Sequence, residues 1–291
     1  MIRQPLHHAG PTFSRIVVGA WRWHVVSGET ISRLIYSALD GGITSFDHAD
    51  IYGDHSNEER FGGVIRKDPS LRNRMELITK CGIKFPSKKR PATWIKHYDT
   101  SKEHIIWSVE NSLQMLGTDR IDLLLIHRAD PLLNPSEVAE AFTQLKDAGK
   151  VLHFGVSNFT PSQYRMLQRH LSFPLVTNQI EISLMKVEPL FNGELDFLME
   201  MGVAPMAWSP LGGGKILPVD ERMLFNKAAK YNLTYSQMLL AWLLRHPSQI
   251  FPIIGTTQPE RIREASKSID TMLDLQDWFE MLQWVTGKEV P

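Results

Sequence analysis

An alternation of short β-like runs with amphipathic helical segments extends over most of the 291 residues. The runs are rich in Val, Ile and Leu, and the segments between them repeat apolar residues every three to four positions, as a helix with one buried face does. Eight strands are expected, at residues 16–19, 45–47, 75–80, 121–127, 152–156, 175–179, 204–208 and 250–254. Eight helices are expected between and after them, at residues 30–40, 57–66, 102–116, 135–148, 161–169, 192–201, 235–245 and 259–267.

Strands that alternate with helices form a parallel sheet, and eight such units close into a TIM (β/α)8 barrel of the α/β class. We predict one barrel domain over residues 1–291, because no repeat, low-complexity tract or linker divides the chain. An N-terminal hairpin over residues 1–15 and a terminal helix over residues 274–286 are expected as decorations. The long connections at 83–100 and 212–222 follow strands three and seven, on the side of the barrel where function is expected.

Helix start signals support these assignments. A capping side chain precedes Glu or Gln by three residues at six positions, the pattern of a capping box. The pairs are Ser56 with Glu59, Thr100 with Glu103, Asn134 with Glu137, Thr160 with Gln163, Thr234 with Gln237 and Thr257 with Glu260.

Composition limits the function classes. Lys+Arg and Asp+Glu number 32 each, so no overall charge favours nucleic acid or an anionic membrane, and a small-molecule partner is expected. The single cysteine, Cys81, excludes an internal disulfide and is expected to be a packed thiol in a cytoplasmic protein. Residues 1–10 contain no apolar signal core. The four cations in 84–90 favour a solvated loop over a nucleic-acid patch, and the sequence does not reveal the oligomeric state.

Four chemically compatible side chains follow three successive strands. Asp47 ends the second strand and Tyr52 follows it, while Lys80 and His127 end the third and fourth. The carboxyl ends of barrel strands are where catalytic residues gather. Each residue also has a structural interpretation, because most buried Tyr and His side chains satisfy a core hydrogen bond and most Asp–Lys pairs are structural.

These four groups suit carbonyl reduction. Tyr52 would donate the proton to the developing alkoxide, although a phenol with a pKa of about 10 is a reluctant acid near neutral pH. We expect the Lys80 ammonium to lower that pKa and Asp47 to hold the lysine charged. Neutral His127 would orient the carbonyl, and no metal is required.

At this point the sequence resembles the aldo-keto reductases, and most closely their bacterial branch similar to potassium-channel β-subunits. The resemblance covers nearly the whole chain, and its motifs are Phe-Asp-His-Ala-Asp-Ile-Tyr-Gly at 46–53, Ile-Thr-Lys at 78–80, Asp-Arg-Ile-Asp-Leu-Leu-Leu-Ile-His at 119–127 and Gly-Val-Ser-Asn-Phe at 155–159. It implies a barrel enzyme that binds NADPH without a Rossmann domain, with Tyr52, Lys80, Asp47 and His127 as its catalytic tetrad.

A nicotinamide site is expected around the later strand ends. Ser157, Asn158 and Gln179 suit a carboxamide, and Trp208 offers a face for ring stacking, although by itself it would be assigned to the core. The glycine run before Lys215 could approach a pyrophosphate or be a plain flexible loop. The predicted cofactor-binding residues are Gly19, Trp21, Asp47, Ser157, Asn158, Gln179, Trp208, Ser209, Pro210, Leu211, Gly212, Lys215, Gly255, Thr256, Thr257, Arg261 and Glu264.

Recognition of the 2′-phosphate of NADPH is assigned to Arg261. Many family members have a Lys-Ser pair where this chain has Gly255 and Thr256, so the preference for NADPH over NADH is expected to be moderate. Arg261, Thr256 and Thr257 remain as phosphate-binding groups.

The expected activity is reduction of an aldehyde or ketone by hydride from NADPH. The predicted substrate contacts are Trp21, Tyr52 and His127. Together with Trp23, His24 and the 83–100 connection, Trp21 suggests a pocket for an apolar or aromatic carbonyl. Two alternatives stay open: a nicotinamide-binding regulatory subunit with slow turnover, and an unrelated barrel lyase or isomerase.

Overall fold

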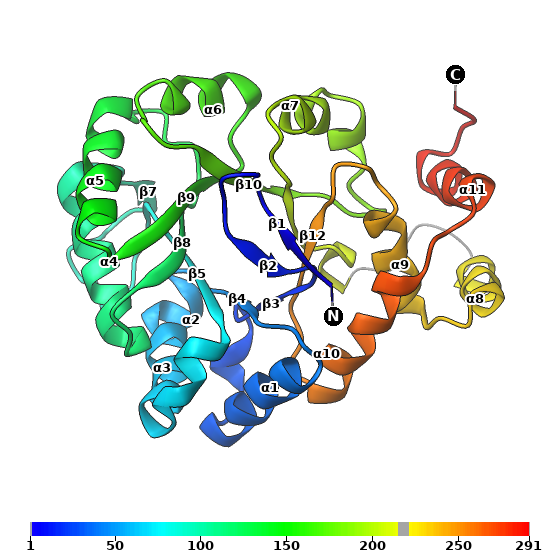
Figure 1. Cartoon of the computed structure of the whole chain (residues 1–291), viewed down its shortest axis with the longest axis horizontal. Helices are drawn as coiled ribbons and strands as arrows, with labels where there is room; N and C mark the ends of the chain where they lie inside the picture. Colours follow the sequence, from blue (N-terminus) through cyan, green and yellow to red (C-terminus); the bar gives the residue numbers. More distant parts are fainter. Residues whose placement is uncertain (1, 215–220, 291) are drawn as a thin grey trace.

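The predicted parallel strands close into a barrel. In the computed structural model, which describes residues 2–214 and 221–290, each strand is parallel to the next and the last pairs with the first (Figure 1). The barrel strands are β3 Val17–Gly19, β4 Ser45–Asp47, β5 Glu76–Cys81, β8 Ile121–Ile126, β9 Val151–Ser157, β10 Leu175–Glu181, β11 Met206–Trp208 and β12 Phe251–Ile254. The prediction of a TIM barrel is confirmed.

Helices surround the barrel, and every predicted helix is present within two residues at each end. They are α1 Gly28–Asp40, α3 Asn57–Lys67, α4 Lys102–Leu116, α5 Pro135–Asp147, α6 Pro161–Gln168, α7 Glu194–Glu200, α9 Tyr235–Leu244, α10 Pro259–Ala265 and the terminal α11 Leu275–Thr286. No helix in the described ranges has the length and hydropathy needed to cross a bilayer.

Helix α8 Glu221–Lys230 was not predicted, because residues 212–222 were expected to form only a connection. Leu224 and Ala228 lie four positions apart, and both are buried in the cluster that holds α9 and α11. That spacing is the helical signal that the prediction missed. Lys227 and Lys230 of α8 both bind Asp277 of α11, each with 2.6 Å between nitrogen and carboxylate oxygen.

Three of the six predicted caps are confirmed: Thr160 and Thr234 form capping boxes, and Asn134 accepts from the backbone N–H of Ser136. The other three are wrong. The Thr100 hydroxyl donates to Asp130 instead, and Ser101 caps α4. The Ser56 side chain makes no cap, and Gln258, not Thr257, precedes α10. Nearby acceptors outside the helix decide which hydroxyl caps it.

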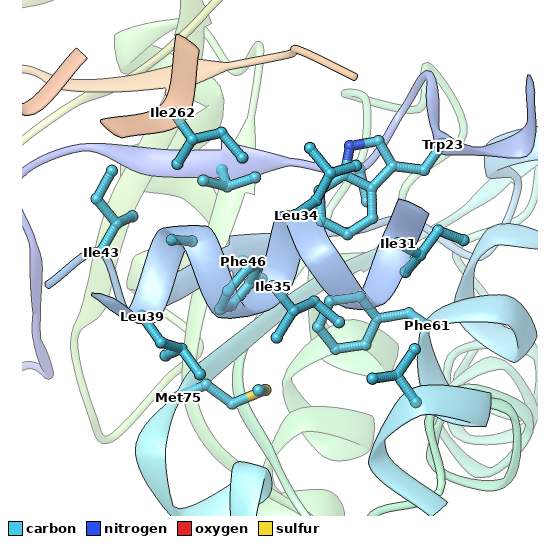
Figure 2. Close-up of a cluster of buried hydrophobic side chains, with 14 of the residues drawn as sticks. Trp23, Ile31, Leu34, Ile35, Leu39, Ile43, Phe46, Phe61, Met75 and Ile262 are labelled. Atoms are coloured by element: carbon cyan, nitrogen blue, oxygen red, sulfur yellow. The ribbon is translucent and has the colours of Figure 1, made fainter. Parts of the chain in front are cut away.

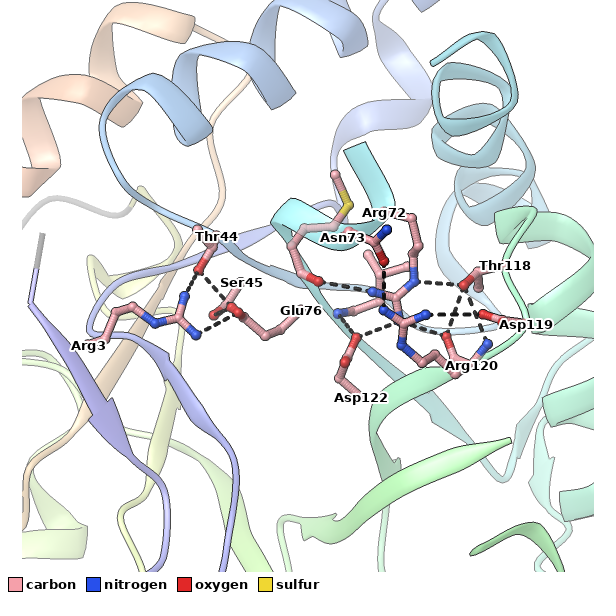
Figure 3. Close-up of polar contacts among 12 residues, drawn as sticks. Arg3, Thr44, Ser45, Arg72, Asn73, Glu76, Thr118, Asp119, Arg120 and Asp122 are labelled. Atoms are coloured by element: carbon pink, nitrogen blue, oxygen red, sulfur yellow. Dashed lines mark hydrogen bonds and ion pairs between the residues drawn. The ribbon is translucent and has the colours of Figure 1, made fainter. Parts of the chain in front are cut away.

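The N-terminal hairpin closes the amino end of the barrel, as predicted. Strands β1 Arg3–Pro5 and β2 Thr12–Ser14 pair antiparallel and lie across the centre of the ring in Figure 1. Leu6 and Phe13 are fully buried among inward-facing strand residues. Arg3 binds Glu76 at 2.7 Å, and Arg72 binds Asp122 at 2.8 Å on the same side of the barrel (Figure 3).

Side chains on each barrel strand alternate between the interior and the helices. On β5, Ile78 joins the interior cluster with Leu123, whereas Leu77 joins the cluster around α1. Figure 2 shows that outer cluster, in which Leu34 and Ile35 of α1 pack near Phe46, Phe61 and Trp23. Because the strand period is two, Thr79 faces the helices and Lys80 faces the interior.

Candidate active site

The barrel brings the four predicted catalytic residues to its carboxyl end. Asp47 is the last residue of β4, Lys80 lies near the end of β5, and His127 directly follows β8. Tyr52 begins the short helix α2 Tyr52–His55 in the loop after β4. Parallel strands in one closed sheet end on the same side, so residues far apart in the sequence meet there.

Lys80 is the centre of the group. Its ammonium donates to Oδ2 of Asp47 at 2.7 Å, to the backbone oxygen of His48 at 2.7 Å and to the Tyr52 hydroxyl at 3.0 Å. The Lys80 side chain is fully buried, and an ammonium has three N–H donors, so each donor has an acceptor. The position of the ammonium relative to Tyr52 is therefore fixed.

Tyr52 is held by an unusual turn. Gly53 and Asp54 within α2 have left-handed φ values of 61° and 54°. A Cβ on Gly53 would lie 2.1 Å from Oδ1 of Asn57, so only glycine fits. Asn57 in turn donates to the backbone oxygen of Ala20 at 2.7 Å, which ties the Tyr52 turn to the loop after β3.

The expected lowering of the Tyr52 pKa is wrong for this structure. Burial raises the pKa of Tyr52, Lys80 opposes that effect, and Asp47 adds to it, so the net shift is upward. The expectation rested on the ammonium alone, but the loss of hydration on burial is the largest contribution to the shift. The phenol therefore keeps its proton near neutral pH.

Lys80 and His127 have the protonation states that were predicted. Burial alone would lower the pKa of Lys80, but Asp47 and Tyr52 outweigh it, so the Lys80 pKa is raised and the ammonium stays charged. Burial, with Lys80 and Arg128 nearby, holds the pKa of His127 well below its usual value. Neutral His127 lies beside Tyr52, with 5.9 Å between ring centroids.

A chain of hydrogen bonds leads from Asp47 to Trp208. Gln179 donates to Oδ1 of Asp47 at 2.9 Å, and the Ser157 hydroxyl donates to the backbone oxygen of Gln179 at 2.9 Å. Asn158 donates to the Ser157 hydroxyl at 2.7 Å and accepts from the Trp208 indole at 2.9 Å. This chain fixes the orientation of the amide groups and of the indole along one wall.

A cavity of about 1330 Å³ opens beside these residues. Its size exceeds the roughly 300–1,000 Å³ of common small-molecule pockets, so it can admit a dinucleotide together with a substrate. The predicted site residues that line it are Gly19, Trp21, Asp47, Tyr52, His127, Ser157, Asn158, Gln179, Trp208, Ser209, Pro210, Leu211, Gly255, Thr256, Arg261 and Glu264.

The remaining predicted residues lie elsewhere. Lys80 is buried beneath Asp47 and Tyr52, and the lining does not include Gly212 or Thr257. Lys215 lies outside the described residues. Trp23 does not shape the pocket as expected: it is buried in the cluster around α1 and donates to the backbone oxygen of Thr256 at 3.1 Å.

Several lining residues were missed by the sequence analysis. Tyr235, Ser236 and Gln237 line the cavity from the start of α9. Their signal was available, because the N-terminus of a helix that follows a barrel strand lies at the catalytic end. Arg128 was also missed, although it directly follows His127. The described residues contain no cluster of three or more His, Cys, Asp or Glu side chains suited to a metal ion.

Cys81 is a buried free cysteine, and burial raises the pKa of its thiol well above the usual value. A thiol held protonated is a poor nucleophile. The prediction of a packed thiol is confirmed.

The fold and the site together define a parallel (β/α)8 barrel that carries a buried Asp–Lys–Tyr cluster at the wall of a ligand-sized cavity. The model of the aldo/keto reductase family matches residues 15–283. The chain therefore belongs to the aldo/keto reductase family, and the resemblance in its motifs is confirmed.

Relatives support the same assignment. The chain is 46% identical over 290 residues to "Uncharacterized oxidoreductase YcsN" of Bacillus subtilis, covering 96% of each chain. It is 43% identical over 284 residues to the "6-dehydroglucose reductase" of Agrobacterium fabrum, covering 95% of this chain and 96% of the relative. The family match and these names support the prediction of an oxidoreductase.

Solved structures have the same fold. A thermostable aldo-keto reductase in complex with the inhibitor epalrestat matches with a TM-score of 0.85 and 25% identity, over 98% of this chain and all of that one. The aldo/keto reductase of Klebsiella pneumoniae in complex with NADP and acetate matches with a TM-score of 0.79 and 24% identity, over 98% of this chain and 96% of the other.

Proposed function

We propose that the protein is an NADPH-dependent reductase that converts an aldehyde or ketone into an alcohol. The observation that carries the proposal is the contact of one buried ammonium with both the carboxylate of Asp47 and the phenol of Tyr52, at 2.7 and 3.0 Å, on the wall of the cavity. An arrangement that only stabilised the barrel would not require a phenol exposed to a cavity.

Each residue has a distinct task in this proposal. Tyr52 donates its proton to the carbonyl oxygen as negative charge develops there. Lys80 stabilises the phenolate that remains, because it keeps its charge and its position next to the hydroxyl. His127 is neutral and can donate one N–H to the same carbonyl oxygen, which orients the carbonyl group.

The chemistry of the cavity wall fits a nicotinamide dinucleotide. Bound NADPH supplies the hydride. Asn158 and Gln179 have amide groups held in place for a carboxamide, and Trp208 offers an aromatic face. Arg261 also lines the cavity, is exposed and has no carboxylate partner among the described residues, so it is available to bind a phosphate.

The proposal is tested by following NADPH oxidation optically with a panel of aldehydes and ketones. We expect turnover with at least some of them, since the Agrobacterium relative is named a 6-dehydroglucose reductase. Tight NADPH binding without turnover of any carbonyl would instead support the regulatory-subunit alternative. That alternative is not favoured, because the family match and the relatives name oxidoreductases.

Cofactor preference tests the Arg261 assignment. One charge-assisted hydrogen bond contributes about 1.5–3 kcal/mol, so we expect NADPH to bind roughly 10- to 150-fold more tightly than NADH. Arg261→Ala should remove most of that preference and leave NADH affinity nearly unchanged. Dissociation constants of both cofactors in both proteins form a complete cycle. Equal weakening of NADH and NADPH would mean that Arg261 supports the helix or the adenine instead.

A further inference from the structure

Two cations line the cavity next to the catalytic histidine. Arg128 directly follows His127 at the end of β8, and Lys96 belongs to the connection between β6 Ile83–Lys84 and β7 His97–Tyr98. Both are near enough to His127 to contribute to its lowered pKa. Both line the same cavity as Tyr52 and His127, and neither belongs to the tetrad.

The Arg128 guanidinium packs against the indole ring of Trp208. Its guanidinium carbon lies 5.4 Å from the centre of the Trp208 ring. No hydrogen bond or ion pair of the Arg128 side chain occurs among the described residues. A guanidinium directs its N–H donors within its own plane, so a group stacked on a ring can still bind an acceptor at its edge.

Lys96 adds a second charge without a partner in the described part of the chain. Its side chain is exposed, so water screens its charge more than that of the half-buried Arg128. Trp21, which also lines the cavity and is 56% exposed, adds an apolar surface to the same pocket. A pocket with both cations and an apolar surface suits a short carbon chain that ends in an anion.

Within the described part of the chain, no carboxylate forms an ion pair with Arg128 or Lys96. Asp47 is already bound to Lys80 and to Gln179, and Asp54 on the same cavity is exposed and lies in the α2 turn. Arg128 also lines a second hollow of about 310 Å³ with Glu181, Glu188 and Glu194, and among the described residues none of these glutamates forms an ion pair with it. Binding an anion is favourable for a half-buried cation that has no carboxylate partner among the described residues.

We propose that the substrate carbonyl compound carries an anionic group, a carboxylate or a phosphate, which Arg128 binds with help from Lys96. This inference rests on the proposed reductase activity and adds the substrate class. It replaces the expectation of a purely apolar or aromatic carbonyl. In this proposal Trp21 contacts the carbon chain of the substrate, and the anionic end of the substrate determines which compounds bind.

The test uses two aldehydes that differ only in charge, 4-oxobutanoate and its methyl ester. We expect the wild-type kcat/KM to be roughly 10- to 100-fold higher for the acid, the range of one charge-assisted hydrogen bond. Arg128→Met should lower kcat/KM for the acid far more than for the ester. Lys96→Met should act in the same direction by a smaller factor, because Lys96 is exposed.

Two controls separate this role from others. Arg169→Met removes an exposed arginine that directly follows α6 and is not among the residues lining the cavity, so it should leave the ratio of acid to ester unchanged. Arg128→Lys keeps the charge and should retain part of the preference for the acid. The dissociation constant of NADPH is measured for each variant, since a role of Arg128 in cofactor binding would change it.

The outcomes are distinct. Equal kcat/KM for the acid and the ester in wild type, with both turned over, would overturn the anion site and leave the reductase proposal standing. A preference for the acid that Arg128→Met does not reduce would overturn the assignment to Arg128. Equal losses by Arg128→Met on 4-oxobutanoate and on glyceraldehyde would assign Arg128 to neutral hydroxyl groups instead. Absence of turnover with every aldehyde would overturn the reductase proposal and this inference with it.

Discussion

Two clusters of buried polar side chains lie on opposite faces of β5, and they hold their carboxyl groups in different ways. On the inner face Lys80 binds Asp47 and Tyr52 next to the cavity. On the outer face Thr79 donates to Glu58 of α3 at 2.5 Å. Thr79 and Lys80 are neighbours in the sequence, so the strand period alone separates the two clusters.

The outer cluster contains no cation bound to its acids. Glu58 accepts from Thr79 and from Ser112, and Asp50 accepts from Ser108 at 2.8 Å. Burial raises the pKa of Asp50 to about 8, and the nearby Glu58 adds to that rise. Burial raises the pKa of Glu58 to about 7. Hydroxyl donors are therefore too weak to keep buried carboxyl groups ionised.

The inner cluster has an ammonium in direct contact with its carboxylate. Lys80 keeps its charge there despite complete burial. His48, which lies between the two clusters, has its pKa lowered to about 3 by burial and by Lys80, so it carries no charge. The comparison shows that a directly paired charge persists at this depth, whereas acids held only by hydroxyl groups are neutral over much of the pH range.

The largest expected effect is on the inner face. Tyr52→Phe keeps the ring and removes only the hydroxyl, so turnover should fall by at least about 100-fold, the contribution of a general acid. NADPH affinity should stay close to that of the wild type. Steady-state rates and a fluorescence titration check both statements, and a variant that kept most of its rate on an unactivated aldehyde would contradict the acid assignment.

Lys80→Met should damage both activity and stability. It leaves Asp47 buried without its cation, and breaking a buried pair costs about 3–5 kcal/mol of unfolding free energy. The double variant Lys80→Met with Asp47→Asn should recover most of the stability, measured by urea unfolding, and none of the rate. Recovery of the rate in the double variant would mean that the ammonium has no catalytic task.

Asp50→Asn tests, through the pH dependence of the unfolding free energy, whether an acid of the outer cluster is neutral. The pKa of Asp50 in the folded state, about 8, lies above its ordinary value of 3.8, so its stabilising effect is full below about pH 4 and is lost as pH rises through about 8. The asparagine amide of the variant does not ionise. We expect the variant to exceed the wild type in unfolding free energy at pH 9 by on the order of a few kcal/mol, and by little at pH 5.

Urea unfolding at pH 5, 7 and 9 measures this difference. Glu58 should still reduce stability with rising pH in both proteins, since its own pKa is raised to about 7. Asp54→Asn is the matched control, because Asp54 is exposed and Asn tolerates its left-handed φ of 54°. Parallel pH curves for wild type and Asp50→Asn would show that Asp50 is ionised in the folded protein.

The smallest effect is expected for Thr79→Val. The substitution removes the hydroxyl that donates to Glu58 and keeps the shape of the side chain, so it should lower stability by about 1–2 kcal/mol. Turnover should match the wild type because Lys80 points to the other face. A tenfold or greater loss of kcat would contradict the separation of the inner and outer clusters, because it would mean that the two faces of β5 act as one network.

The barrel and the place of its Asp–Lys–Tyr cluster could be predicted from the sequence alone. The eight strands and their helices follow from apolar periodicity, which reports the face that each residue buries. Asp47, Tyr52, Lys80 and His127 could be found because each lies at or just beyond a strand end, and parallel strands end together. These features depend on local pattern and on a symmetric architecture, and both can be read along the chain.

Properties that depend on neighbours across space follow from the folded structure and not from local pattern. The upward shift of the Tyr52 pKa, the raised pKa of Asp50 and the packing of Arg128 against Trp208 all depend on burial and on side chains distant in sequence. Asp47 and Asp50 are three residues apart, yet one faces an ammonium and the other faces a serine hydroxyl. The physical reason is that hydration and Coulomb interactions depend on distance in the folded molecule, which local sequence pattern does not specify.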